Sequence, residues 1–238
     1  MDSSDQVEVE VKFAVDASTP IPNFSSVGGV VSVGTERYFS LSATYYDTPD
    51  LQLTRKKITL RRRRGGPDEG WHLKLPGQHG RREVHAPLDA GEFSNPHQVY
   101  PPHTLIDVLT KDIPTVASTT TFIAIAQVDN ERHITDIMVN YHEATPATHH
   151  NDAHQTTTSD VHKGAEFCDD HVTSRGLLPG GVTHHWREWE IELSSTLAQR
   201  QHANNLLDRL SQHTTAAGAR ISTSPSKLVM AMGDTMPS

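Results

Sequence analysis

The clearest pattern in the chain is a strict alternation of apolar and charged positions near its N-terminus. Residues Val7–Phe13 read Val-Glu-Val-Glu-Val-Lys-Phe. Successive side chains of a strand point to opposite faces, so Glu8, Glu10 and Lys12 share one face and the valines share the other. Trp186–Leu193 alternates in the same way, with glutamates at every second position. The two segments predict strands that are apolar on one face and carboxylate-rich on the other.

A third alternating region is basic. Seven of the ten residues from 55 to 64 are Lys or Arg. A strand at Ile58–Arg64 places Arg61 and Arg63 on one face. A second strand at Trp71–Leu75 follows the turn signal of residues 65–68, Gly-Gly-Pro-Asp, so the two strands are predicted to form a hairpin.

The remaining pattern predicts short strands and a few helices. The further strands are expected at Tyr38–Tyr46, Arg81–Ala86, Thr121–Val128, His133–Tyr141 and Glu166–Ser174. The helices are expected at Asn23–Val27, His103–Thr110 and Leu197–Leu210, with a last one that starts at Ser224–Pro225. Residues 142–163 are polar and rich in Thr, His, Asp and Asn, which predicts a long loop or insertion.

Many short strands with few helices indicate a mostly antiparallel α+β fold. Two arrangements are consistent with the alternation. If the charged faces point inward, they line a barrel or tunnel whose apolar outer face is covered by helices. If they point to solvent, the protein is an ordinary one-sided sheet.

Composition narrows the function classes. The 238 residues have a net charge of −8, yet 12 of the 21 Lys and Arg fall within residues 1–82, which indicates a local anion site and not a nucleic-acid surface. No segment approaches the roughly 20 apolar residues of a membrane span. The start of the chain lacks a signal-peptide pattern, and Cys168 is the single cysteine, so a cytoplasmic location is expected.

Carboxylates on some strands and guanidinium groups on another suit a metal-bridged polyphosphate. Hard divalent cations take carboxylate oxygens, and arginine forks bind phosphate oxygens. A basic edge strand exposed to solvent is the alternative for residues 55–64, and spacing does not decide between them.

The ordered motifs resemble the CYTH superfamily, the triphosphate tunnel metalloenzymes. The motifs are Glu8-x-Glu10-x-Lys12, Tyr45-Tyr46-Asp47-Thr48-Pro49, Leu60–Arg63, Trp71–Gly77, Arg82-Glu83, Glu188–Leu193 and Ser226–Leu228. The first eighty residues are most similar to the thiamine-triphosphatase branch. The resemblance implies a closed eight-stranded antiparallel β-barrel with helices packed outside, formed by one domain over residues 1–238.

The resemblance also implies roles for individual residues. Mg²⁺ or Mn²⁺ would be held by an acidic set: Glu8, Glu10, Glu190, Glu192 and an aspartate of the pair Asp169 and Asp170. Phosphate oxygens would be bound by a basic set: Lys12, Arg61, Arg63, Lys74 and Lys227. Lys12, Glu10 and Glu190 would be the catalytic residues. The implied activity is metal-dependent hydrolysis of inorganic triphosphate or of an organic triphosphate such as thiamine triphosphate.

One feature departs from the family pattern. The family usually has an arginine on a central strand, but the corresponding stretch at residues 117–122 has no basic residue, and Arg132 lies further along. The missing arginine keeps open a non-catalytic binder of polyphosphate or nucleotide, and the resemblance itself also permits an adenylate cyclase. The expected partner is a small molecule that contains a triphosphate, with neither nucleic acid nor membrane, and the oligomeric state is not predicted.

Overall fold

The computed structural model describes residues 5–77, 80–95, 98–140, 161–199, 203–223 and 226–237. Its strands are β1 (Asp5–Glu8), β2 (Glu10–Val15), β3 (Val30–Val33), β4 (Arg37–Asp47), β5 (Thr59–Arg64), β6 (Gly70–Gly77), β7 (Gly80–Ala86), β8 (Glu92–Asn95), β9 (Gln98–Tyr100), β10 (Phe122–Asn140), β11 (Val161–Gly176), β12 (Thr183–Leu193) and β13 (Arg220–Ile221). Its helices are η1 (Phe24–Ser26), α1 (Gln52–Arg55), α2 (His103–Asp112), α3 (Ser195–Ala198), α4 (Ala203–Ala216), α5 (Lys227–Met232) and η2 (Gly233–Thr235).

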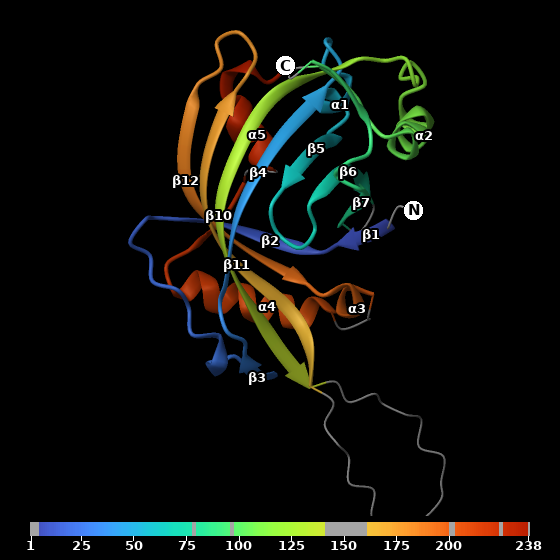
Figure 1. Ribbon diagram of the computed structural model, residues 1–238. Helices are drawn as coiled ribbons and strands as arrows, with labels where there is room; N and C mark the ends of the chain where they lie inside the picture. The colour runs from blue at the N-terminus through green and yellow to red at the C-terminus, as the bar shows by residue number, and fades with distance from the viewer. Residues whose placement is uncertain are drawn as a thin grey trace, which may run out of the picture.

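The thirteen described strands form one antiparallel sheet (Figure 1). The hydrogen-bonded order along its main path is β1-β7-β6-β5-β4-β10-β11-β12-β2-β13. The long strands β4, β10, β11 and β12 run side by side and curve strongly, and the shorter strands β5, β6 and β7 continue the sheet beyond β4. This arrangement confirms an antiparallel, sheet-rich α+β fold.

The N-terminal strand is interrupted at Val9. The first part, β1, pairs with β7, whereas the second part, β2, pairs with β12 at the far side of the sheet. One continuous segment therefore contacts both flanks of the sheet. The main path still ends at β1 and at the two-residue strand β13, so the sheet departs from the expected eight-stranded barrel in strand number.

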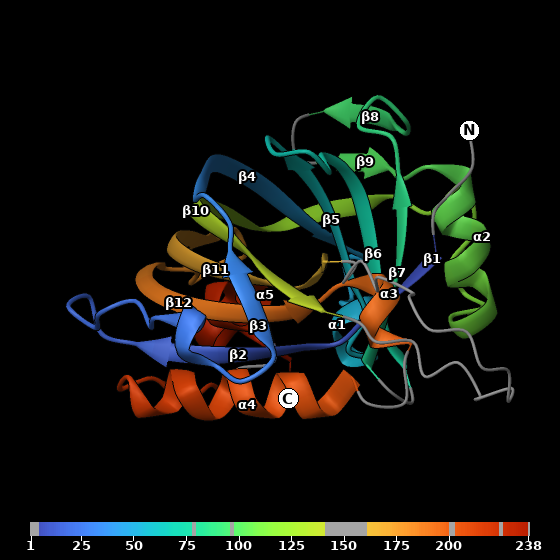
Figure 2. The same ribbon diagram turned by 90° about the horizontal axis from the view of Figure 1, so that it is seen from below.

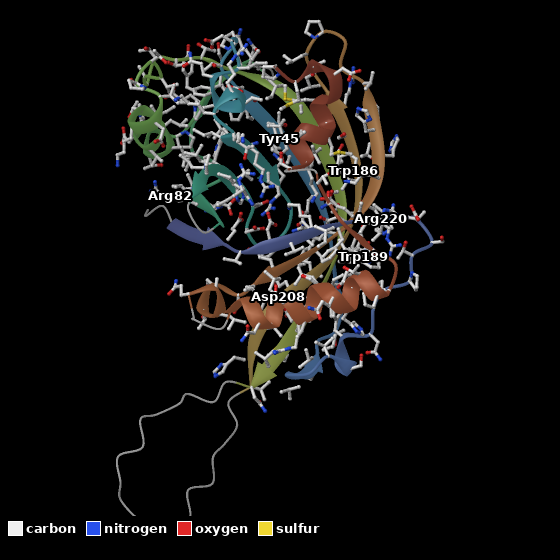
Figure 3. All side chains as sticks on the ribbon, turned by 180° about the vertical axis from the view of Figure 1, so that it is seen from behind. Tyr45, Arg82, Trp186, Trp189, Asp208 and Arg220 are labelled. Carbon is white, nitrogen blue, oxygen red and sulfur yellow. The ribbon has the colours of Figure 1, made fainter. Side chains whose placement is uncertain are left out.

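Two helices cover the apolar outer face of the sheet. Helix α4 packs on β2, β11 and β12 (Figures 2 and 3), and Trp189 is fully buried there in a cluster that includes Leu210. Helix α2 packs on β5, β6 and β7, where Trp71 is fully buried in a cluster with Leu105 and Leu109. Both tryptophans thus lie on the helix-covered face, as their parity along the strands predicts.

Helix α5 packs on the other face of the sheet. Its apolar residues Leu228 and Ala231 belong to a cluster with Tyr45 and Val128, which also line the central cavity. Figure 3 shows Tyr45 beside this helix. The Ser226 hydroxyl caps the helix by accepting a hydrogen bond from the Val229 amide, which places the next residue, Lys227, at the cavity. Among the described helices, none is both long and apolar enough to cross a bilayer.

Several predicted boundaries were wrong. The strands expected at 121–128 and 133–141 are one strand, β10. The helix expected at 197–210 is two helices, α3 and α4, and residues 200–202 between them lie outside the described residues. The predicted loop at 142–163 lies outside them up to residue 160, whereas residues 161–163 pair with β10 as part of β11. Ser224 and Pro225 also lie outside them, and the described cap of α5 is Ser226.

Candidate functional site

The concave face of the sheet encloses a cavity of about 240 Å³ whose walls are mostly charged. Its acidic residues are Glu8, Glu10, Asp68, Glu83, Glu166, Glu190 and Glu192, and its basic residues are Lys12, Arg37, Arg61, Arg63, Lys74, Arg81, Arg132 and Lys227. The charged faces of the alternating strands therefore point inward. This excludes the alternative of a one-sided sheet whose charges meet solvent.

Part of the acidic wall lies where β2, β11 and β12 meet. Glu192 stands opposite Glu10 on one neighbouring strand and opposite Glu166 on the other. Burial raises the pKa of Glu192 to about 8, with further contributions from the negative charges of Glu8 and Glu10. Within the described residues, the Glu192 side chain makes no hydrogen bond or ion pair. Glu192 is therefore a carboxylate of this wall that no cation among the described residues contacts directly.

Two lysines partly neutralise the same wall. The ammonium nitrogen of Lys12 donates to Glu10 Oε2 at 3.0 Å and also to Glu190. The ammonium nitrogen of Lys74 donates to both oxygens of Glu8, at 2.6 and 2.7 Å. Burial opposes the charge of Lys12, yet the two glutamates raise its pKa above the ordinary value. Both lysines are therefore held by carboxylates of this wall.

A second carboxylate group lies deeper in the fold. One oxygen of each of Asp170, Glu188 and Glu190 lies within 4.8 Å of the others, a spacing that could hold a metal ion. Besides Lys12, which contacts Glu190, two further cations contact this group. Arg132 Nε donates to Asp170 Oδ1 at 2.7 Å, and Lys227 Nζ lies 2.7 Å from Glu190 Oε1 and 2.8 Å from Asp170 Oδ2. Although burial opposes ionisation, Arg132 and Lys227 hold the pKa of Asp170 below its usual range.

The basic wall is formed by alternate residues of β5. Arg61 and Arg63 both line the cavity, and the Nε of each is buried without a hydrogen-bond partner. Burial, followed by repulsion from Arg61, lowers the pKa of Arg63 to about 10. Asp68 pairs with one end of the Arg63 guanidinium. Because a buried donor without an acceptor is costly, these two guanidinium groups favour an anion close to them.

The other two arginines of β5 lie outside the cavity. Arg62 donates to the carbonyl oxygen of Leu88 and stacks over Phe93, with 5.0 Å from its Cζ to the ring centroid. Arg64 is exposed. The alternation along β5 therefore separates the four arginines into two that face the cavity and two that do not.

The tyrosine pair divides in the same manner. Tyr46 packs against Trp71 in the outer core, with ring centroids 5.5 Å apart. Tyr45 lines the cavity beside Arg61. Burial tends to raise the pKa of Tyr45, but the positive charges of Arg61, Lys227 and Lys74 together lower that pKa.

One predicted metal ligand was wrong. Asp169 lies on the opposite face of β11 from Asp170, where its carboxylate accepts hydrogen bonds from Arg187 Nε at 2.8 Å and from Trp189 Nε1 at 3.0 Å. Side chains of adjacent strand residues cannot share a face, so of this pair only Asp170 reaches the carboxylate group. Cys168 is buried, and burial raises its thiol pKa, which agrees with an inert thiol.

Sequence reasoning missed three charged residues. Arg132 faces the cavity from near the middle of β10, beyond the stretch at residues 117–122 that has no basic residue. Glu83 on β7 lies 3.9 Å from both Arg61 and Lys74. Glu188 extends the glutamate alternation of β12 by one more position, and that extension was visible in the sequence.

A model of the CYTH domain matches residues 6–212, more than half of the chain. The chain belongs to the CYTH family. Its most similar curated relatives include an uncharacterized protein of Mycobacterium tuberculosis, 35% identical over 97% of this chain. The chain spans 41% of the length of that relative.

Two further comparisons concern named CYTH-like proteins. Human thiamine-triphosphatase is 39% identical over 74 residues, which is 31% of this chain and 29% of that protein. A Bacillus halodurans protein with a provisional assignment as an adenylate cyclase has a similar fold, with a TM-score of 0.53, 15% identity and coverage of 95% of this chain and 97% of its own. At that identity, the second likeness shows only that the CYTH fold is shared.

Proposed function

We propose that this CYTH domain hydrolyses a triphosphate, inorganic or organic, in a reaction that depends on Mg²⁺ or Mn²⁺ and takes place in the central cavity. The observation that carries the proposal is the charge arrangement of that cavity. Carboxylates with raised pKa values lie on one wall, and buried guanidinium groups with unpaired N–H donors lie on another. A cation and a polyphosphate anion together would satisfy both.

The acidic wall fits a hard divalent cation. Glu8, Glu10 and Glu192 offer oxygen donors, which are the ligands that Mg²⁺ and Mn²⁺ prefer. The raised pKa values of Glu8 and Glu192 reflect burial and crowding that a cation would relieve. The other two predicted ligands, Glu190 and Asp170, belong to the second carboxylate group. We assign the metal to the Glu8 side of the cavity, because Arg132 and Lys227 already neutralise the Asp170 group.

The basic residues then bind the phosphate chain. Arg61 and Arg63 present unpaired donors, whereas Lys12, Lys74 and Lys227 are held by carboxylates. A bound divalent cation would supply Lewis-acid charge neutralisation at the phosphate oxygens. With the carboxylates engaged elsewhere, the lysines can turn to the phosphate oxygens and stabilise the charge of the transferring phosphoryl group. We propose that Lys12, between Glu10 and Glu190, lies nearest to the reacting phosphate.

An organic substituent on the triphosphate has space next to the cavity. A second pocket shares Thr59, Arg81 and Ser226 with the cavity wall, and its other lining residues are mostly apolar. These include Ile58, Leu228, Val229 and Met236. The similarity to thiamine-triphosphatase over 74 residues supports thiamine triphosphate as one such compound to test.

We also propose that the sheet closes into a tunnel and that residues 1–238 form one domain. The continuous segment from β1 to β2 contacts both β7 and β12, which supports closure. Lys227 lies beyond the region matched by the family model and still contacts Glu190 of that region, which supports a single domain.

Product analysis tests this function. The purified protein is incubated with inorganic triphosphate, thiamine triphosphate or ATP, in Mg²⁺, in Mn²⁺ or in EDTA. We expect orthophosphate release in either metal and none in EDTA. Pyrophosphate and cyclic AMP from ATP would instead identify a cyclase. No turnover in any metal would leave a non-catalytic binder of polyphosphate and would contradict the proposal.

A further inference from the structure

His72 is a buried residue behind the cavity wall, where it contacts two wall residues, Glu83 and Asp68, and it has no role in the proposed reaction. It lies on β6 two positions before Lys74, so both side chains share one face of the strand. Only 2% of its surface is exposed. Its ring connects β7 to the turn between β5 and β6, because it contacts Glu83 on one side and Asp68 on the other.

Both ring nitrogens of His72 face hydrogen-bond acceptors. Nδ1 lies 2.7 Å from Glu83 Oε1, and Nε2 lies 3.0 Å from the carbonyl oxygen of Asp68. A neutral imidazole has one N–H and can donate to only one of them, whereas an imidazolium donates to both. Glu83 is an acceptor because its carboxyl is ionised: burial opposes this, but Lys74 lowers its pKa. Both acceptors therefore receive a hydrogen bond from the ring only when both of its nitrogens are protonated.

The charges around an empty cavity oppose that second proton. Burial, followed by the positive charges of Arg61 and Arg63, holds the pKa of His72 far below its usual range. His85 lies edge-on to the ring, with centroids 4.9 Å apart, and also disfavours the imidazolium. The Asp68 carboxylate acts in the opposite direction but is outweighed. The His72 ring therefore has the hydrogen-bond acceptors that an imidazolium needs, but the burial and positive charges around it keep it neutral while the cavity is empty.

We propose that His72 is a positioning residue that binds a proton when a polyphosphate occupies the cavity beside Arg61 and Arg63. The inference rests on the proposed function, because it requires a phosphate anion in this cavity. Such an anion would neutralise the two arginines and remove the main repulsion of an imidazolium. The protonated ring would then donate to both Glu83 and the Asp68 carbonyl.

The consequence lies in the two residues that the ring fixes. Glu83 lies 3.9 Å from both Arg61 and Lys74, and Asp68 pairs with Arg63. A ring that bonds to the Glu83 carboxylate and to the Asp68 carbonyl oxygen would hold in place the two residues that orient these cations. Polyphosphate binding is then coupled to proton uptake, and affinity falls as the pH rises above the pKa of His72 in the complex.

Calorimetry with inorganic triphosphate tests the coupling. Binding is measured in EDTA, so that no metal-linked proton release contributes, in two buffers of different ionisation enthalpy at pH 7. The difference gives the number of protons taken up. We expect wild type to take up close to one proton more than His72→Gln, on the order of one per site. His133→Gln is the matched control, since His133 contacts Glu36 and does not line the cavity, and it should behave as wild type.

Nitrogen NMR of the wild-type histidines provides a second readout that needs no variant. With triphosphate bound, both ring nitrogens of His72 should show protonated shifts, and without it only one should. Equal proton uptake in wild type and His72→Gln, or an unchanged His72 signal on binding, would overturn the inference and leave the proposed function intact. Failure of triphosphate to bind wild type at all would contradict the proposed function itself.

Discussion

Whether a residue of the sheet faces the cavity depends on whether it occupies an odd or an even position along its strand. Arg61 and Arg63 face the cavity while Arg62 and Arg64 do not, and Asp170 reaches a carboxylate group that Asp169 cannot. Parity explains these cases because successive side chains of a strand alternate between faces. It also provides a control for a proposed phosphate ligand, namely an arginine of the same strand whose side chain faces away from the cavity.

Replacing Arg61 by Ala should weaken the binding of inorganic triphosphate by about 10- to 100-fold, since a charge-assisted hydrogen bond is worth about 1.5–3 kcal/mol. Arg64→Ala removes the same charge from the exposed face of the same strand and should change the dissociation constant less than about twofold. Calorimetry on both variants measures the difference. Similar losses in the two would indicate a diffuse basic surface in place of a cavity site.

Glu192 makes metal-free stability depend on pH. Its folded-state pKa is about 8, above its ordinary value of 4.5, so the folded state binds more protons between these values. Stability therefore falls as the pH rises from about 4.5 to 8. In EDTA, Glu192→Gln should melt roughly 3–8 °C above wild type at pH 8.5. The difference in melting temperature between Glu192→Gln and wild type should disappear near pH 4.5.

Melting curves across this pH range, with Glu36→Gln as a control, test the Glu192 prediction. Glu36 is an exposed carboxylate that contacts His133 outside the cavity. A pH-independent gap between Glu192→Gln and wild type would mean that Glu192 is not crowded by other carboxylates.

At the scale of helices and strands, the sequence predicted the type of an element better than the residues at which it begins and ends. The alternating segments became β2, β5, β6 and β12 with their expected faces, because a cavity-facing polar position and a core-facing apolar position give a strong period of two. The same cavity made β10 hard to predict, because it allows polar residues in the middle of the strand. Residues 129–132 are all polar, which suggested a break, yet they stay paired with both β4 and β11.

The physical reason lies in the two faces of β10. Asn130 and Arg132 point into a polar cavity, while Asp129 and Glu131 bond to Ser42 and Ser40 on the other face. A strand with polar surroundings on both sides has no hydrophobic alternation to detect. Arg132 was missed for this reason, since its segment was not expected to be a strand.

The start of α1 depends on one buried carboxylate. Asp47 accepts hydrogen bonds from the amides of Thr48, Leu53 and Thr54 and from the Thr54 hydroxyl. Asp47→Ala leaves these buried donors unpaired and should lower the free energy of unfolding by about 2–4 kcal/mol. Asp50→Ala, an exposed carboxylate of the same turn, should change it by less than about 0.5 kcal/mol. Denaturant unfolding of both variants decides, and equal effects would contradict the role of Asp47.

At the scale of the whole molecule, the protein is acidic, but the acidic and basic side chains of its cavity largely neutralise one another. Three lysines and Arg132 hold the carboxylates, and two further arginines retain unpaired donors. A metal alone must compete with the lysines, and a polyphosphate alone leaves the acidic wall crowded. Each ligand should therefore strengthen the binding of the other, as expected when they share one charge network.

The most direct test of this account is orthophosphate release from inorganic triphosphate by wild type and Glu10→Gln. Glu10 pairs with Lys12 and lies opposite Glu192, so its loss should remove a metal ligand without removing a phosphate ligand. We expect wild type to turn over in Mg²⁺ or Mn²⁺ and not in EDTA. Glu10→Gln should lose at least about 100-fold of that rate, equivalent to about 2.7 kcal/mol, and Glu36→Gln should lose none. Metal-independent release by wild type, or full activity in Glu10→Gln, would contradict the central claim.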